Sequence, residues 1–273
     1  MASRTHSHRI LSAAGHMIFI SKDGQDEYIN AFARGCGQRA VNLDDFVYES
    51  SAEPLVLRGI LKYKIMQRCW QEQRDFYYMD TGYFGNTGFK QWHRVVRNDL
   101  QHSELRTVPD DRWRRLGIKM KSWNRSGKNI LLALPDDKPC RFYGINRQQW
   151  IDDTVKKIQS YTDRPVVIRE RAAKRSDRQV NSFAQALQQD VFAVVTFNSI
   201  AAVESILNGI PAFVLAPTHA ARPVAATDLV QIETPFYPDE DLRYRWACHL
   251  GYGQFHTSEL ANGTALKILK QYD

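Results

Sequence analysis

The residues best placed to do chemistry lie in one stretch of the second half, residues 191–217. A continuous apolar run over 191–197 predicts a buried parallel strand, and Asn198 and Ser199 follow it where the chain should turn. Both residue types favour the N-cap position, so we expect them to open a short helix over 200–207. Because the first N–H groups of a helix have no partner within it, this turn is predicted to bind an anion such as phosphate.

Glu204 stands at a distance from this turn that suits a nucleotide. It lies five positions beyond Ser199, which is roughly 7.5 Å along a helix at ~1.5 Å per residue. That separation matches the offset between the diphosphate of a nucleotide and its ribose hydroxyls. Gly209 is expected to end the helix, and residues 211–216 form a second buried strand. The alternative interpretation is an ordinary βαβ unit that carries a surface glutamate.

The pattern Asn-Ser-x-x-x-x-Glu-x-x-x-x-Gly-x-Pro resembles the donor-binding half of GT-B glycosyltransferases, most of all the bacterial capsule-polysaccharide group and related phage enzymes. The resemblance covers about residues 128–217. It implies that the Asn198 and Ser199 end of the helix meets the donor diphosphate and that Glu204 meets the ribose. It also implies a nucleotide sugar as co-substrate, a UDP-sugar foremost, with no tightly bound cofactor and no obligatory metal.

Two more loops follow predicted strands of the same half. Arg169 and Lys174 bring positive charge to one of them, where they would hold the diphosphate and stabilise the leaving nucleotide. The capsule-type enzymes often carry a His-Pro pair just after such an arginine, but residues 172–173 are alanines here, which departs from the family pattern. On the other loop, Thr218 and His219 are predicted donor contacts, although a single histidine is more often structural.

The first half offers a candidate catalytic acid. A predicted strand over 76–79 leads to Asp80 and then into a loop that continues to Asn86. Ligands of open α/β sheets bind at the carboxyl ends of strands, so Asp80 is our candidate general base for the acceptor hydroxyl. Tyr83 and Phe84 would stack on a sugar ring or a nucleobase. The alternative is a turn in which Asp80 bonds the backbone and the aromatic rings fill a domain seam.

The segment after this loop mixes basic and aromatic side chains. In residues 90–102, we expect Trp92, Arg94 and Arg97 to face an acceptor with a phosphate backbone. The chain also carries a formal net charge of +7, which favours an anionic partner. We therefore expect the acceptor to be double-stranded DNA, with a hydroxymethylated base of phage DNA as the sugar-accepting group. A solvated strand edge with one buried tryptophan is the alternative for this segment.

Two other functions fit the same residues. One is a capsule or lipopolysaccharide glycosyltransferase, which shares the donor site and differs in the acceptor. The other is a nucleic-acid-binding protein on a degenerate transferase fold, which would bind DNA without turnover. Salt-sensitive DNA binding and stabilisation by a nucleotide would separate these possibilities.

These residues need two sheets to position them. The 273 residues suit two small domains, and we predict an α/β protein with two Rossmann-like halves in a small GT-B-like arrangement. Residues 17–125 would form the acceptor-side half, and residues 126–273 the nucleotide-sugar-binding half with terminal helices that cross back. The link between the halves is expected over 109–128, and no G-x-G-x-x-G fingerprint appears in the first half.

The ends and the cysteines add little chemistry. Residues 1–16 are interpreted as a tag or a disordered leader, because Gly15-His16-Met17 resembles a cloning junction. Four scattered cysteines form no C-x-x-C pair, so reduced thiols are expected. No apolar run approaches the ~20 residues of a membrane span. With no apolar signal region, we expect a cytoplasmic protein, in the host cytoplasm if it is phage-encoded.

Overall fold

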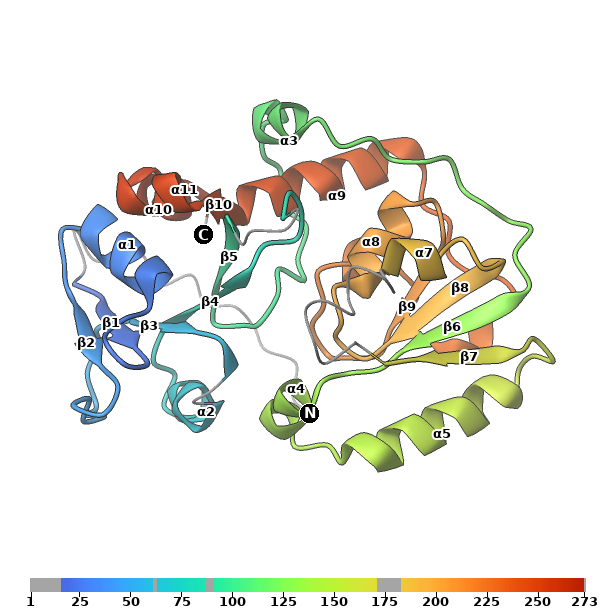
Figure 1. The fold of residues 1–273 in the computed structure, drawn as a ribbon, viewed down its shortest axis with the longest axis horizontal. Helices are drawn as coiled ribbons and strands as arrows, with labels where there is room; N and C mark the ends of the chain where they lie inside the picture. Colours follow the sequence, from blue (N-terminus) through green and yellow to red (C-terminus); the bar gives the residue numbers. More distant parts are fainter. Residues whose placement is uncertain (1–15, 61–62, 87–90, 171–182, 273) are drawn as a thin grey trace.

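The computed structural model describes residues 16–60, 63–86, 91–170 and 183–272 of the chain. Residues 1–15 of the leader and the predicted donor residue Lys174 lie outside these ranges. Two separate sheets lie side by side, each flanked by helices, and one long helix passes from the second domain back to the first (Figure 1). Within the described ranges no helix is both long and apolar enough to cross a bilayer.

The first sheet has six strands in the order β10-β5-β4-β3-β1-β2. Its strands are β1 (Ile18–Ser21), β2 (Ala40–Asn42), β3 (Leu55–Arg58), β4 (Phe76–Thr81), β5 (Trp92–Arg97) and β10 (Gln254–His256). The first four strands are parallel, and β5 runs antiparallel to β4. Successive side chains of a strand point to opposite faces of the sheet, so neighbouring residues pack against different helices. Phe19 and Val56 pack with helix α1 (Glu27–Gly35), whereas Ile20 and Leu57 pack with α2 (Tyr63–Gln71).

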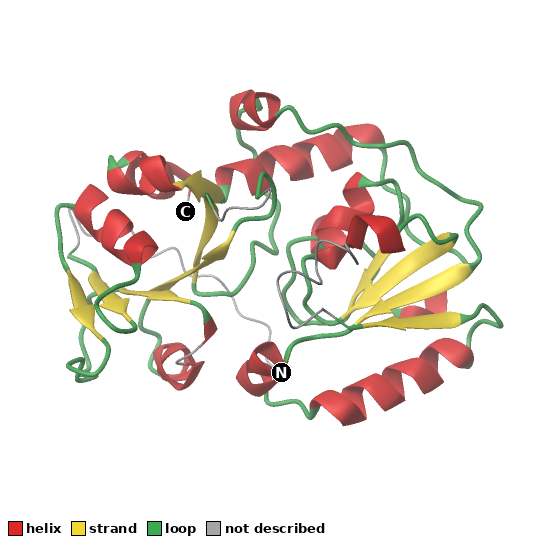
Figure 2. Cartoon of the chain, in the orientation of Figure 1, coloured by secondary structure: helices red, strands yellow, loops and turns green. Residues whose placement is uncertain are grey.

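The second sheet has four parallel strands in the order β7-β6-β8-β9. They are β6 (Asn129–Ala133), β7 (Val166–Arg169), β8 (Val191–Thr196) and β9 (Ala212–Val214). Helix α5 (Arg147–Gln159) covers one face, while α7 (Phe183–Ala186) and α8 (Ala201–Leu207) cover the other (Figure 2). Because both faces are covered, every residue of β8 is buried, as its continuous apolar run predicts. The predicted α/β class with two Rossmann-like halves is confirmed.

The end of the chain returns to the first domain. Helix α9 (Glu240–Tyr252) leads to β10, which pairs antiparallel with β5, and then to α10 (Thr257–Ala261) and α11 (Thr264–Tyr272), which contact α1. The crossing itself agrees with the expectation for the terminal helices. The short strand Gln254–His256 is a feature that the sequence does not predict, and it completes the first sheet and buries Phe255 in its core.

Two segments expected to be irregular contain helices. Residues 137–143, expected in a long loop, form α4 (Asp137–Tyr143). Phe142 on this helix is buried against Trp70 of α2, with ring centroids 4.6 Å apart, so packing between the two domains stabilises a helix that the sequence marks weakly. The link between the domains includes α3 (Asp111–Leu116), which packs against α9. Short 3-10 turns, η2 (Arg222–Val224) and η3 (Leu229–Gln231), follow β9.

Arg112 on α3 anchors the returning segment. Its guanidinium donates to both carboxylate oxygens of Glu259, at 2.7 and 2.8 Å. It also donates to the carbonyls of Gly251 and Gln254, at 3.0 and 2.7 Å. Only 6% of the arginine is exposed. One side chain thus connects the linker to the end of α9, to β10 and to α10.

We predict that Arg112→Met lowers the free energy of unfolding by about 3–5 kcal/mol, because it leaves the half-buried Glu259 carboxylate without its cation. Chemical denaturation followed by circular dichroism measures this. Arg115→Met on the same helix is the control: Arg115 is largely exposed and lies 3.5 Å from Asp111. Its loss should cost less than about 1 kcal/mol. Equal effects of the two substitutions would contradict the anchoring role.

Two buried histidines, His249 on α9 and His102 packed against it, predict a dependence of stability on pH. His102 and His249 have ring centroids 5.5 Å apart, and burial lowers the pKa of His249 to about 4 and that of His102 well below its ordinary value. Both rings are neutral in the folded protein, whereas histidines of the unfolded chain take up protons near pH 6.5. The folded pKa values are depressed, so the free energy of unfolding should fall as the pH drops below about 6.5.

Urea denaturation at pH 8, 6 and 5 measures this loss. His249→Gln removes one of the titrating rings and should flatten the decline between pH 6.5 and 5, the window in which the unfolded chain takes up protons on histidine. A decline of the same steepness in wild type and variant would show that other groups carry it.

Candidate active site

The carboxyl ends of strands from both sheets meet at the seam between the domains. Tyr83 and Phe84 follow β4 of the first sheet, and they lie in one buried cluster with Ala202 and Val203 of α8 and with Ala220, which follows β9. Loops that leave the two sheets at their ligand-binding edges therefore contact each other. In open α/β folds this edge is where substrates bind, so the seam is the place to look for a site.

The turn predicted to receive the donor phosphate lies at this seam. Ser199 is partly exposed to solvent there, and Asn198 is 9% exposed. The predicted N-cap is wrong, because Ile200 occupies that position and its side chain makes no capping bond. The Ser199 hydroxyl instead accepts a hydrogen bond from the Ala201 N–H, at 3.3 Å. Since α8 has only seven residues, positive charge for an anion has to come from a side chain nearby.

The Glu204 carboxylate influences the pKa of Arg169. Six of the seven residues of α8 are buried, and Glu204 is the partly exposed one. Arg169 is the last residue of β7, and its guanidinium lies 5.2 Å from the Phe183 ring centroid. Burial lowers the pKa of Arg169, and the nearby Glu204 carboxylate opposes that effect. The charges of the arginine predicted to bind phosphate and the acid predicted to bind ribose therefore influence each other, and their donor-binding roles stay predictions.

His219 lies at the seam but does not reach a ligand. It is fully buried, its Nε2–H donates to the Ser199 carbonyl at 2.9 Å, and its Nδ1 accepts from the Ala221 N–H at 2.9 Å. Burial lowers the pKa of His219 to about 4, although the Ser199 carbonyl partly opposes this, so the ring is neutral. The prediction that His219 contacts the donor is therefore wrong. It positions Ser199 instead.

Thr218 lies next to it and is partly exposed. Its hydroxyl donates to a carboxylate oxygen of Asp99 at 2.7 Å, and the Tyr143 hydroxyl lies 2.9 Å from it. Asp99 belongs to the loop after β5 in the first domain, whereas Thr218 and Tyr143 belong to the second. These three side chains therefore connect the domains at the predicted donor edge.

Asp80 belongs to β4 itself rather than to the loop that the sequence suggests. One carboxylate oxygen accepts from the Tyr78 hydroxyl at 2.7 Å and from Arg94 at 3.2 Å, and the other accepts from the Thr81 N–H at 2.8 Å. Burial raises the pKa of this carboxyl, but Arg94 and Tyr78 outweigh burial and hold the pKa below its ordinary value. The side chain is 36% exposed, so a substrate can reach an ionised carboxylate here.

The residues predicted to bind the acceptor do not form an exposed surface. Tyr83 and Phe84 are only 4% and 5% exposed, so stacking on a ligand is wrong for both. Arg94 is 7% exposed and donates to the carbonyls of Leu100 and Thr81 in addition to Asp80. A phosphate-facing role for Arg94 is therefore wrong too. The aromatic rings fill the domain seam, which is the alternative that the sequence left open.

The two other residues of this set are partly exposed and engaged within the sheet. Arg97 pairs with Asp75 at 2.7 Å, across β4 and β5. The Trp92 indole packs over Gly85 and makes an edge contact with His256, with ring centroids 5.4 Å apart. The predicted strand over this segment is confirmed, but its arginines and aromatic residues build the first domain.

Sequence reasoning missed Gln101, which is 3% exposed and lies in the loop after β5. Its amide Nε2–H donates to the Asn198 carbonyl at 2.6 Å, and its Oε1 accepts from the Ala220 N–H at 3.0 Å. A glutamine of the first domain thus joins the two loops of the second domain that carry the donor residues. No motif marks such a residue, because a lone amide in a polar loop has no characteristic spacing.

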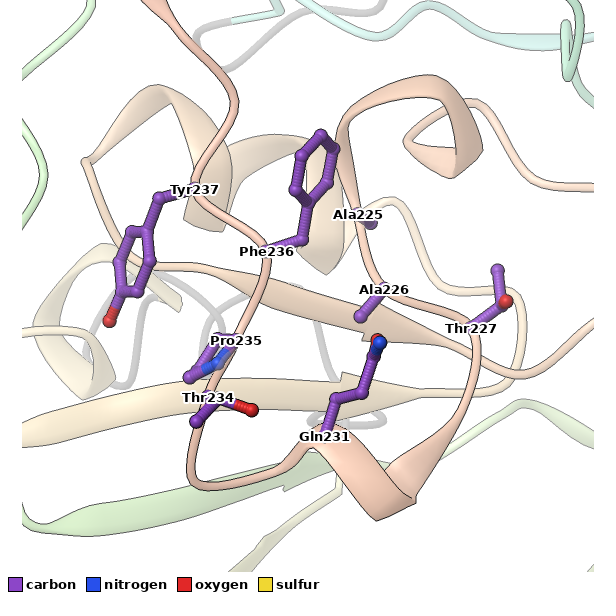
Figure 3. A pocket seen from close by; sticks show the side chains of 8 residues that line it. All are labelled: Ala225, Ala226, Thr227, Gln231, Thr234, Pro235, Phe236 and Tyr237. Atoms are coloured by element: carbon purple, nitrogen blue, oxygen red, sulfur yellow. The ribbon is translucent and has the colours of Figure 1, made fainter.

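A cavity of about 450 Å³ lies away from these residues, beside β9 (Figure 3). Small and aromatic side chains line it, among them Ala226, Thr234 and Phe236, and none of the predicted site residues that the structure describes belongs to its lining. The charged side chains gather at the seam instead. We therefore locate the candidate active site at the seam, around the Ser199 turn and Asp80.

No family model and no curated protein matches this sequence. The solved structures that are similar to it include two of KpsC from Thermosulfurimonas dismutans. The beta Kdo 2,4 transferase is 9% identical, covers 86% of this chain and 90% of its own, and superposes with a TM-score of 0.50. The beta Kdo 2,7 transferase is 10% identical, with 92% and 99% covered and a TM-score of 0.51. The chain has a GT-B-like glycosyltransferase fold, as the resemblance in its sequence implies.

Proposed function

We propose that this chain is a glycosyltransferase that moves a sugar from a nucleotide-sugar donor to a hydroxyl of an acceptor. One observation carries the proposal. Arg169, whose pKa is lowered by burial and partly raised again by the charge of Glu204, ends β7 at the carboxyl edge of the second sheet, and Ser199 is partly exposed where the chain leaves β8 at the same edge, in a chain with a GT-B-like fold. Across the seam, the first sheet contributes Asp80 as an ionised, reachable carboxylate.

The donor would bind to the second domain. Its phosphates would lie against the Ser199 turn, with Arg169 as the cation that holds them and stabilises the charge of the leaving nucleotide. Glu204, one and a half turns further along α8, would accept hydrogen bonds from the ribose hydroxyls. The lowered pKa of Arg169 reflects a guanidinium that is partly removed from water, and an added phosphate would stabilise its charge.

The chemical step would take place between this donor and Asp80. The acceptor oxygen forms a bond to the anomeric carbon, the bond from that carbon to the phosphate oxygen breaks, and the acceptor proton moves to a carboxylate oxygen of Asp80. Arg94 and Tyr78 hold this carboxylate ionised and oriented before the reaction. The nucleotide leaves with the electron pair of the broken bond, and no metal takes part in this scheme.

A saccharide is the better-supported acceptor. Two similar structures are transferases named for Kdo, a sugar, which favours the capsule or lipopolysaccharide alternative. The hydroxymethylated base of phage DNA rests on the net charge of +7, because Arg94, Tyr83 and Phe84, which supported it, are internal. A panel of nucleotide sugars with saccharide and hydroxymethylated DNA acceptors, analysed by mass spectrometry, decides between them.

Nucleotide binding is the first prediction from this site. A nucleoside mono- or diphosphate that matches the donor should raise the melting temperature, with a stabilisation of about 2.7 kcal/mol at a hundred times its Kd. Glu204→Gln should weaken that effect, because a neutral amide is a poorer acceptor for two ribose hydroxyls. Glu240→Gln, an exposed acid in the first turn of α9, is the matched control. If no nucleotide of a uridine, cytidine, guanosine and adenosine series stabilises wild type, the donor site is refuted.

Asp80→Asn is the second prediction. It should lower turnover by about 10²–10⁴-fold, because an amide cannot take the acceptor proton. Asp75→Asn serves as a matched control, since Asp75 also pairs with an arginine across β4 and β5, at 2.7 Å from Arg97, but at the opposite end of the strands. Its turnover should stay near wild type. Unchanged turnover in a well-folded Asp80→Asn variant would remove Asp80 from the mechanism.

A further inference from the structure

Side chains help to orient the Asn198–Ser199 turn, in addition to the backbone bond from the Ala202 N–H to the Ser199 carbonyl at 3.3 Å. The Asn198 carbonyl receives the Gln101 amide at 2.6 Å, and the Ser199 carbonyl receives His219 at 2.9 Å. The peptide bonds of the described residues are trans. In a trans peptide the N–H of the next residue points opposite to the carbonyl. Fixing these two carbonyls therefore also fixes the directions of the Ser199 and Ile200 N–H groups.

The orientation of these peptides matters for an anion. A flipped peptide would turn a carbonyl oxygen toward a phosphate, and the two negative charges would repel each other. With the carbonyls held on the buried side, the Ser199 N–H meets the Thr196 hydroxyl at 3.3 Å, and the Ile200 N–H points away from His219. The buried hydrogen bonds thus keep the two carbonyl oxygens from turning toward a phosphorylated ligand. Because the Ser199 N–H already bonds Thr196, the Ile200 N–H is the one of the two that would serve the ligand.

Gln101 differs from His219 in that it comes from the other domain. Its second contact, to the Ala220 N–H at 3.0 Å, holds the loop that carries Thr218 and His219. The same first-domain loop also holds Thr218 through Asp99, at 2.7 Å. The loop after β5 therefore supports both donor loops of the second domain at once, and burial of Gln101 leaves its amide few alternatives to these partners.

We propose that Gln101 is a positioning residue for the donor: it fixes the peptide orientation of the Asn198–Ser199 turn, so that the second domain binds nucleotide well only while the loop after β5 of the first domain is seated against it. This inference rests on the proposed function, because it concerns the same donor turn. Gln101 itself touches neither donor nor acceptor, and its effect passes through the backbone of residues 198–199.

The test compares two glutamines that bridge the same two domains. Gln101→Met removes the donor N–H at the turn and keeps the length of the side chain. Gln67→Met is the matched control, since Gln67 on α2 donates to the Phe142 carbonyl on α4 at 2.8 Å, away from the turn. The Kd of the nucleotide that stabilises wild type is measured by calorimetry, the melting temperature is measured without ligand, and KM and kcat are measured with the nucleotide sugar.

Gln101→Met should raise the Kd of the nucleotide and the KM of the donor by about tenfold, roughly the effect of one lost hydrogen bond, with kcat changed much less. Gln67→Met should lower the melting temperature similarly and leave Kd and KM near wild type. Gln101→Glu, which can still accept from Ala220 but has no N–H for Asn198, should weaken binding as the methionine variant does.

Two results would overturn the inference. One is a folded Gln101→Met variant that binds nucleotide as tightly as wild type. The other is an equal loss of affinity in Gln67→Met, which would mean that general contact between the domains is responsible. If wild type itself binds no nucleotide, the proposed function fails together with this inference, and that outcome is distinguishable from the first two.

Discussion

A buried carbonyl oxygen needs a hydrogen-bond donor, and this requirement shapes the seam between the two domains. Where the chain leaves β8, backbone N–H groups still serve the Phe197 and Ser199 carbonyls. Side chains supply further donors: Gln101 from the first domain bonds Asn198, and His219 bonds Ser199. The domains are thus joined by directional bonds at the place where the candidate site lies, in addition to the apolar contacts around Tyr83 and Phe84.

Two of the ionisable groups at the seam, His219 and Asp80, have different charge states. His219 is neutral because burial lowers its pKa, and its two ring nitrogens bond the backbone. Asp80 remains ionised because Arg94 and Tyr78 compensate its burial. A neutral positioning ring in one domain and an ionised, partly exposed carboxylate in the other suit a reaction in which one group must hold the substrate site and another must accept a proton.

The sequence predicted the elements whose patterns are local, and missed those that depend on distant partners. The apolar run of β8 and the positive φ of Gly209 follow from short stretches of the chain. Strand β10 does not, because Gln254–His256 become a strand only by pairing with β5, about 160 residues earlier. Among the candidate site residues, Arg169 and Glu204 come from a sequence pattern, but Gln101 bonds backbone atoms of residues that no local pattern connects to it.

The basic character of the chain is only partly a surface property. Among the residues that the structure describes, four arginines are almost fully buried, and each donates to at least two backbone carbonyls: Arg74 to Glu49 and Glu53, Arg94 to Thr81 and Leu100, Arg112 to Gly251 and Gln254, and Arg243 to Lys121 and Ile206. A guanidinium has five N–H donors in a fixed plane, so one arginine can satisfy several carbonyls where a chain crosses between elements.

These four positive charges contribute to the net charge of +7, yet they present almost no surface to a partner. Net charge is a reliable guide to an anionic partner only when the cations are exposed. In this chain the arginines connect strands, linker and returning helix, and they need their positive charge for hydrogen bonding rather than for attracting DNA. When a basic chain passes between two domains several times, its arginines can be needed to bond backbone carbonyls inside the protein. A positive net charge in such a chain is therefore weak evidence for nucleic-acid binding.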